Sequence, residues 1–260
     1  MGVLYALRPE VHLYATAGKG FETPTLNELG YRPNGATGLN FDLKPSRSNS
    51  LELGVKTRSA TFGELTAAVF GTRTNDEIVT LSNVGGRSVY QNVASTRRLG
   101  LELEWTQQLP YDFSAQASYT LTDARYTEAF LSCTTTPCAN PVTPIASGNR
   151  IPGIARNALV ASLAWAPPRG WHAGIEARAL SRVYVNDTNS DSASSYLTAG
   201  LNAGYTLPLG AWQWSGYARI DNLADRRYVG SVIVNEGNGR YFEPAPERTF
   251  FAGITGSCRF

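Results

Sequence analysis

The chain has 260 residues and a formal net charge of +2, with three lysines and no basic run interleaved with aromatic residues, so it does not indicate a nucleic-acid partner. Its mean hydropathy is −0.22 and no stretch approaches 18 apolar residues, which excludes transmembrane helices. A membrane barrel remains compatible with these totals, because barrel strands alternate and average to a near-neutral hydropathy.

Alternation of apolar and polar residues recurs along the chain and predicts β-strands, whereas helical periodicity is almost absent. The expected strands, in chain order, cover residues 11–18, 51–58, 64–72, 98–106, 113–122, 158–165, 171–178, 197–206, 212–221 and 248–260, after a strand-like tail at 2–6. Segments 64–72 and 158–165 alternate less cleanly than the others. In the last segment Phe251 is the single apolar residue on the polar side.

The connections between these segments are of two kinds that alternate without a break. Short connections rich in Pro or Gly fall at residues 8–10, 61–63, 109–111, 167–170 and 207–210. Long polar connections fall at residues 22–47, 75–89, 127–153, 186–195 and 234–247. This order predicts an up-and-down meander of hairpins with the tight turns at one end and the large loops at the other.

Strand length and aromatic placement favour a membrane barrel over a soluble β-sandwich that serves as a binding module. Sandwich strands usually run about 5–6 residues, whereas a strand that crosses a bilayer needs roughly 9–11. Aromatic residues sit at strand ends, as in the girdles of membrane barrels; they are Trp105, Trp165, Trp171, Tyr205, Trp212 and Phe260. The fold class expected is therefore all-β, a transmembrane antiparallel β-barrel.

Six stretches in order resemble the C-terminal half of TonB-dependent outer-membrane receptors. They are LYATAGKGFETPT (Leu13–Thr25), FDLKPSRSNSLELGVK (Phe41–Lys56), YQNVASTRRLGLELEW (Tyr90–Trp105), NRIPGIARN (Asn149–Asn157), RIDNLADRRYVGS (Arg219–Ser231) and the terminal Phe260. The resemblance implies a barrel of about 22 strands around a plugged lumen. Residues 1–260 would supply its last ten strands and the end of the strand before. We expect neither the plug domain nor a signal peptide within this chain.

The resemblance also implies a location, a function and partners. The protein would be an integral protein of the bacterial outer membrane, in contact with its lipid. It would import a scarce nutrient, most often a ferric siderophore or similar chelate. Energy would come from TonB through a plug domain not present in this chain. The alternative is a small self-contained outer-membrane porin or barrel enzyme.

Signals for catalysis, a cofactor or a metal site are weak, so we expect no enzyme. The two histidines, His12 and His172, fall on the polar sides of different strands and are expected to line the lumen or contact a plug. Phosphate-binding glycine loops and the common hydrolase and metalloprotease motifs do not occur. Facing charges on the strands are expected to bond one another or a plug domain; they are Glu102, Glu104, Glu176, Arg178, Arg219 and Asp221.

Ligand capture is expected in the long loops, where arginine forks suit anionic chelates and tyrosines give amphipathic contact area. The candidate ligand-binding residues are Tyr31, Arg32, Tyr126, Arg150, Arg240 and Tyr241. In the stretch SCTTTPCAN, Cys133 and Cys138 lie five residues apart in a Pro- and Thr-rich loop. The loop is expected on the oxidising extracellular side, so we predict a disulfide between them.

Overall fold

The computed structural model describes residues 1–133 and 140–258. Its main feature is one sheet of eleven antiparallel strands, in which β10, for example, pairs with β9 on one side and β13 on the other. In sheet order the strands are β1 (Gly2–Arg8), β2 (Val11–Glu22), β3 (Ser46–Ser59), β4 (Gly63–Val84), β5 (Arg87–Leu109), β6 (Phe113–Tyr126), β9 (Asn157–Trp165), β10 (Gly170–Leu180), β13 (Tyr196–Leu209), β14 (Trp212–Asp221) and β17 (Thr249–Cys258).

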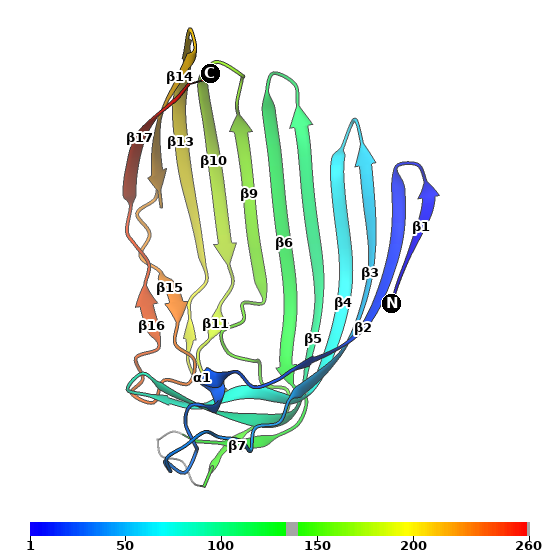
Figure 1. Ribbon diagram of the computed structural model, residues 1–260, viewed down its shortest axis with the longest axis vertical. Helices are drawn as coiled ribbons and strands as arrows, with labels where there is room; N and C mark the ends of the chain where they lie inside the picture. The colour runs from blue at the N-terminus through cyan, green and yellow to red at the C-terminus, as the bar shows by residue number, and fades with distance from the viewer. Residues whose placement is uncertain (134–139, 259–260) are drawn as a thin grey trace.

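The sheet is a meander, with the long connections at one end and tight turns at the other; the hairpin of β4 and β5 is the exception, because its tight turn lies at the end of the long connections (Figure 1). The strands β1 and β17 form its two edges, so the barrel is not closed by this chain. The ten predicted strands and the strand-like tail are confirmed, the tail being β1. Within the part of the chain described here, no helix combines the length and the apolar character needed to cross a membrane.

The long connections contain short elements of their own. These are the helix α1 (Leu26–Leu29) and three two-stranded sheets made of β7 (Phe130–Ser132) with β8 (Thr143–Ile145), β11 (Val183–Tyr184) with β12 (Ser192–Ala193), and β15 (Val229–Val232) with β16 (Phe242–Pro244). The helix begins with a capping box, in which the side chain of Thr25 accepts from the Glu28 backbone and Glu28 reaches back.

The prediction of a long loop at residues 75–89 is wrong. The strands β4 and β5 continue through this range and meet at a two-residue turn, Gly85-Gly86; this part of the two strands is called the extended hairpin. Both glycines have positive φ, 59° and 77°, which is the geometry that a tight hairpin requires and that glycine adopts without steric cost. The alternation fails here because the register of β4 shifts between Thr80 and Ser82, and the adjacent residues Leu81 and Ser82 are both 2% exposed.

The two faces of the sheet differ in chemistry. One face is apolar and exposed, with Trp171, Phe250 and Ile254 exposed by 63%, 70% and 80%. The other face, called the polar face below, carries Glu176, which lies beside Gly200 in the register of β10 and β13. An exposed apolar surface of this extent indicates contact with lipid or another apolar partner.

The largest apolar cluster of buried residues lies at the loop end of the sheet, where the ends of β4, β5 and β6 meet the long connections. Its buried members are Val79, Val93, Ala124, Tyr126, Ile145 and Ile151. These residues come from the extended hairpin, the end of β6 and the connection after it. The loops are therefore packed together at one end of the sheet. This packed region is called the loop cap, and the eleven-stranded sheet is called the wall.

Candidate functional site

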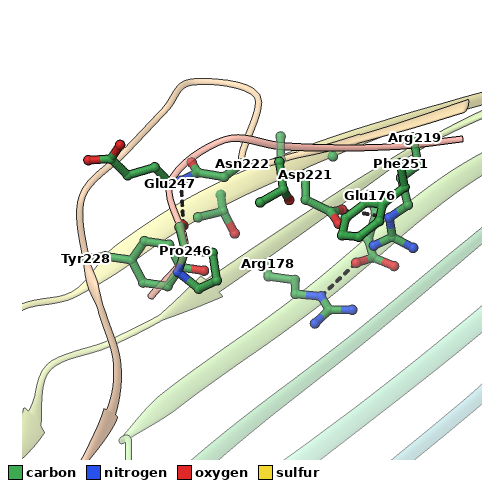
Figure 2. A pocket seen from close by; sticks show the side chains of 13 residues that line it. Glu176, Arg178, Arg219, Asp221, Asn222, Tyr228, Pro246, Glu247 and Phe251 are labelled. Atoms are coloured by element: carbon green, nitrogen blue, oxygen red, sulfur yellow. Dashed lines mark hydrogen bonds and ion pairs between the residues drawn. The ribbon is translucent and has the colours of Figure 1, made fainter. Parts of the chain in front are cut away.

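A pocket of about 300 Å³ lies on the polar face near the loop end of the last strands (Figure 2). We call it the wall pocket. Its charged lining residues are Glu176 and Arg178 on β10, Arg219 and Asp221 on β14, and Glu247 before β17. Residues two apart on a strand share a face, and this spacing brings each arginine beside a carboxylate.

Both arginines of the wall pocket are paired through one nitrogen. The Nε of Arg178 donates to Oε1 of Glu176 at 2.7 Å, and the Nε of Arg219 donates to Oδ1 of Asp221 at 2.7 Å. The predicted pairing between facing charges is thus confirmed for these four residues. Their terminal nitrogens make no further hydrogen bond within the described residues, and the side chains are 60% and 44% exposed. Each guanidinium can therefore still donate to a ligand or to another segment.

Gly200 and Phe251 shape the wall pocket. Gly200 lies between the two ion pairs, and a Cβ built there would approach Oδ1 of Asp221 to 3.1 Å. Phe251 lies beside Arg219 in the register of β14 and β17 and is 53% exposed. The pocket thus combines balanced charges with one exposed aromatic ring, which suits a ligand that carries charges of both signs.

A second group of polar residues joins the loops and is called the Asp187 cluster. The hydroxyl of Tyr126 donates to Oδ1 of Asp187 at 2.7 Å, and Nδ2 of Asn235 donates to Oδ2 of Asp187 at 2.9 Å. Asn235 also donates to the carbonyl of Thr80 at 2.8 Å. Asn149 donates to the Asp187 carbonyl at 2.8 Å. Three residues from separate segments, Tyr126, Asn149 and Asn235, therefore all donate a hydrogen bond to Asp187.

Asp187 is buried, with 2% of its surface exposed. Burial raises the pKa of Asp187, and the hydrogen bonds from Tyr126 and Asn235 oppose that effect without cancelling it. Neither Asp187 nor Asn235 belongs to a motif in the sequence that would mark it as functional. They are separated by 48 residues and their meeting leaves no local pattern in the sequence.

The predicted ligand residues are distributed over the loop cap. Tyr31 packs under the guanidinium of Arg87 at 5.6 Å, and Arg32 lies 3.9 Å from the carboxylate of Asp42. Arg240 is exposed, and the ring of Tyr241 lies 6.1 Å from that of Phe242.

Two of the predicted ligand residues have structural partners. Tyr126 is 1% exposed and bonded to Asp187, so its side chain braces the loops and offers no surface to a ligand in this structure. Arg150 forms an ion pair with Asp123 at 3.1 Å and is 20% exposed. The structure thus does not gather the six residues into one site.

A pocket of about 380 Å³ lies in the loop cap and is lined by Asp187, Asn235, Glu236 and Tyr241. Of the predicted ligand residues, Tyr241 is the one that lines it. No group of three or more His, Cys, Asp or Glu side chains suited to a metal ion is found among residues 1–133 and 140–258.

The predicted disulfide involves a residue that the structure does not describe. Cys133 directly follows β7, and Cys138 falls within residues 134–139, outside the described residues. The link between them stays a prediction.

Comparison with known proteins gives a consistent result. Residues 1–223 match the family model described as "TonB dependent receptor-like, beta-barrel". The chain is 30% identical over 240 residues to the metal-pseudopaline receptor CntO of Pseudomonas aeruginosa (strain UCBPP-PA14), an alignment that covers 88% of this chain and 29% of the receptor.

Solved structures share the fold at lower identity. The siderophore receptor PiuA from Acinetobacter baumannii superposes with a TM-score of 0.77 at 21% identity, over 98% of this chain and 35% of that one. The copper transporter OprC superposes with a TM-score of 0.72 at 19% identity, over 99% and 38%. The chain thus spans about a third of the length of the proteins that it matches.

Proposed function

The chain belongs to the TonB-dependent receptor family, and from this premise we propose that it forms part of a receptor that imports a metal chelate, most simply a ferric siderophore. Proteins of this family are integral to the outer membrane, so the exposed apolar face of the sheet lies against lipid. The polar face then lines the lumen, and the loop cap lies on the extracellular side.

The observation that carries the proposal is the difference between the two faces of one wall. The apolar face carries exposed rings such as Trp171, whereas the lumen face carries paired charges near the loop cap. A ligand that crosses the loops would meet the wall pocket next, because the pocket lies at the loop end of the strands. The guanidinium groups of Arg178 and Arg219 suit the anionic groups of a chelate.

The printed names of the similar proteins support the same class of substrate. One is a receptor for metal-pseudopaline, one is a siderophore receptor and one is a copper transporter. All three names refer to a metal or its carrier. We propose that energy for import comes from TonB, contacted through a plug domain.

Uptake by whole cells tests the proposal. A strain that lacks the gene should lose accumulation of one labelled metal chelate under metal limitation, and the intact gene should restore it. The panel should contain catecholate, hydroxamate and carboxylate ferric siderophores together with copper and other metal chelates. Uptake should also disappear in a TonB-deficient strain. Unchanged accumulation of every chelate, or uptake that persists without TonB, would contradict the proposal.

A further inference from the structure

A groove of about 420 Å³ lies near the loop end of the wall and is called the rim groove. Tyr119, Leu159, Ala179 and Leu197 form one row across four neighbouring strands of the sheet, each opposite the next in register. Their positions belong to the apolar face, since Ala179 lies eight residues after Trp171 on β10 and so shares its face. Leu159 and Leu197 are exposed by 38% and 55%. Ala179 is the smallest of the four, and it leaves a notch between the two leucines.

The next row toward the loops is polar. It consists of Asn157, Ser181 and Ser195, which lie two residues beyond Leu159, Ala179 and Leu197 and so share their face. The hydroxyl of Ser181 accepts from the Asn157 backbone at 2.9 Å. The side chain of Asn157 accepts from Tyr119 at 2.7 Å. These contacts fix the polar row directly beside the apolar row.

Arg226 lines the groove beside the polar row. Its Nη2 donates to the carbonyl of Ser195 at 3.2 Å. The neighbouring Arg227 is paired with Glu247 at 3.0 Å, whereas no carboxylate lies within ion-pair distance of Arg226 among the described residues. The lining of the rim groove contains no acidic side chain from the part of the chain described here. Arg226 therefore keeps a positive charge available to an external anion.

The order of these rows matches a lipid at the membrane boundary, with its acyl chain against leucine and alanine and its headgroup against serine, asparagine and arginine. A guanidinium donates to phosphate in a fork geometry, and hydroxyls can add single hydrogen bonds. We propose that the rim groove binds a phosphate-bearing lipid of the outer leaflet, with the phosphate on Arg226 and an acyl chain over the Ala179 notch. The proposal depends on the location in the outer membrane and not on the imported substrate.

Native mass spectrometry of the purified receptor that contains this chain tests the proposal, with diphosphorylated lipid A as the probe and the same lipid without phosphates as its control. Arg226→Gln should weaken binding of the phosphorylated lipid about tenfold or more, as expected for one charge-assisted hydrogen bond. Arg226→Lys keeps the charge and should retain most of the binding. Arg227→Gln is the matched control, because Arg227 does not line the groove.

Substitutions that fill the notch at Ala179 give a second, independent test of the proposal. Ala179→Phe should reduce binding by closing the space between the leucines, and Ala177→Phe should not, because Ala177 shares the apolar face but does not line the groove. Folding of each variant is checked by heat-modifiable migration on gels. Equal binding of both lipids, competition by inorganic phosphate alone, or full binding by Arg226→Gln and Ala179→Phe would each overturn the proposal.

Discussion

Tyr126→Phe removes one hydroxyl from the Asp187 cluster and leaves the ring in the apolar core. The lost bond is that from Tyr126 to the Asp187 carboxylate, 2.7 Å long and buried. A hydrogen bond to a charged group contributes roughly 1.5–3 kcal/mol. A loss of about 2 kcal/mol corresponds to a roughly 30-fold more frequent opening of the loops, since 1.36 kcal/mol is a factor of ten.

Hydrogen exchange of loop amides measures this opening directly. The informative amides are those of Asn235 and Gly237, which donate to the carbonyls of Val185 and Asn83. Their exchange should accelerate about 30-fold, while amides in the middle of β13 and β14 keep their rates. Tyr31→Phe is the control, because Tyr31 is 44% exposed and lies outside the cluster. Unchanged loop exchange, or an equal acceleration in the strands, would refute the reasoning.

The same cluster predicts a pH dependence. Because the pKa of Asp187 is raised above its ordinary 3.8, the closed loops bind a proton more tightly than the opened loops do. The contribution of Asp187 to loop closure is fully present below pH 3.8 and is lost as pH rises through the raised pKa. Loop exchange, corrected for its intrinsic pH dependence, should therefore accelerate as pH rises through this range. A constant corrected rate would contradict this. In the wall pocket, Arg178→Gln or Arg219→Gln should raise the chelate concentration needed for half-maximal uptake about tenfold, whereas Arg58→Gln, which changes an exposed ion pair with Glu64 at the tight-turn end, should not. Glu77→Gln removes the carboxylate that pairs with Arg98, where the side chains are 14% and 27% exposed, and should locally destabilise the extended hairpin by about 1–3 kcal/mol in hydrogen exchange; equal protection in variant and parent would show that the pair is dispensable. Mass spectrometry of an unreduced digest should find Cys133 linked to Cys138, and detection of both as thiols under oxidising conditions would contradict the predicted disulfide.

The sequence predicted the wall well because each membrane strand meets two different environments. Residues on one face contact lipid and those on the other face the lumen, so period-2 alternation and strand length carry the information. The strands that enter the loop cap do not separate two such environments. In the extended hairpin Leu81 and Ser82 are neighbours in the chain and both 2% exposed, so no alternation marks the strand.

The contacts that hold the loops together could not be predicted from the sequence, because they join residues that are far apart in the chain. Asp187 meets Tyr126, which is 61 residues away, and Asn235, which is 48 residues away. Nothing in a single sequence distinguishes a loop tyrosine that will contact a ligand from one that will be buried against a distant carboxylate. The sequence therefore places Tyr126 among the candidate ligand-binding residues, whereas the structure buries it against Asp187.

In the last strand, a single break in the alternation of apolar and polar residues coincides with a site. Phe251 interrupts an otherwise regular alternation, and the structure places it on the lumen face beside Arg219, in the lining of the wall pocket. A ring that is 53% exposed on a polar face costs free energy in water unless something covers it. Lipid cannot do so, because the lipid contacts the opposite face. We therefore expect a group inside the lumen to cover Phe251, and a surface that fits the wall pocket would combine an apolar patch for Phe251 with charges for Arg178 and Arg219.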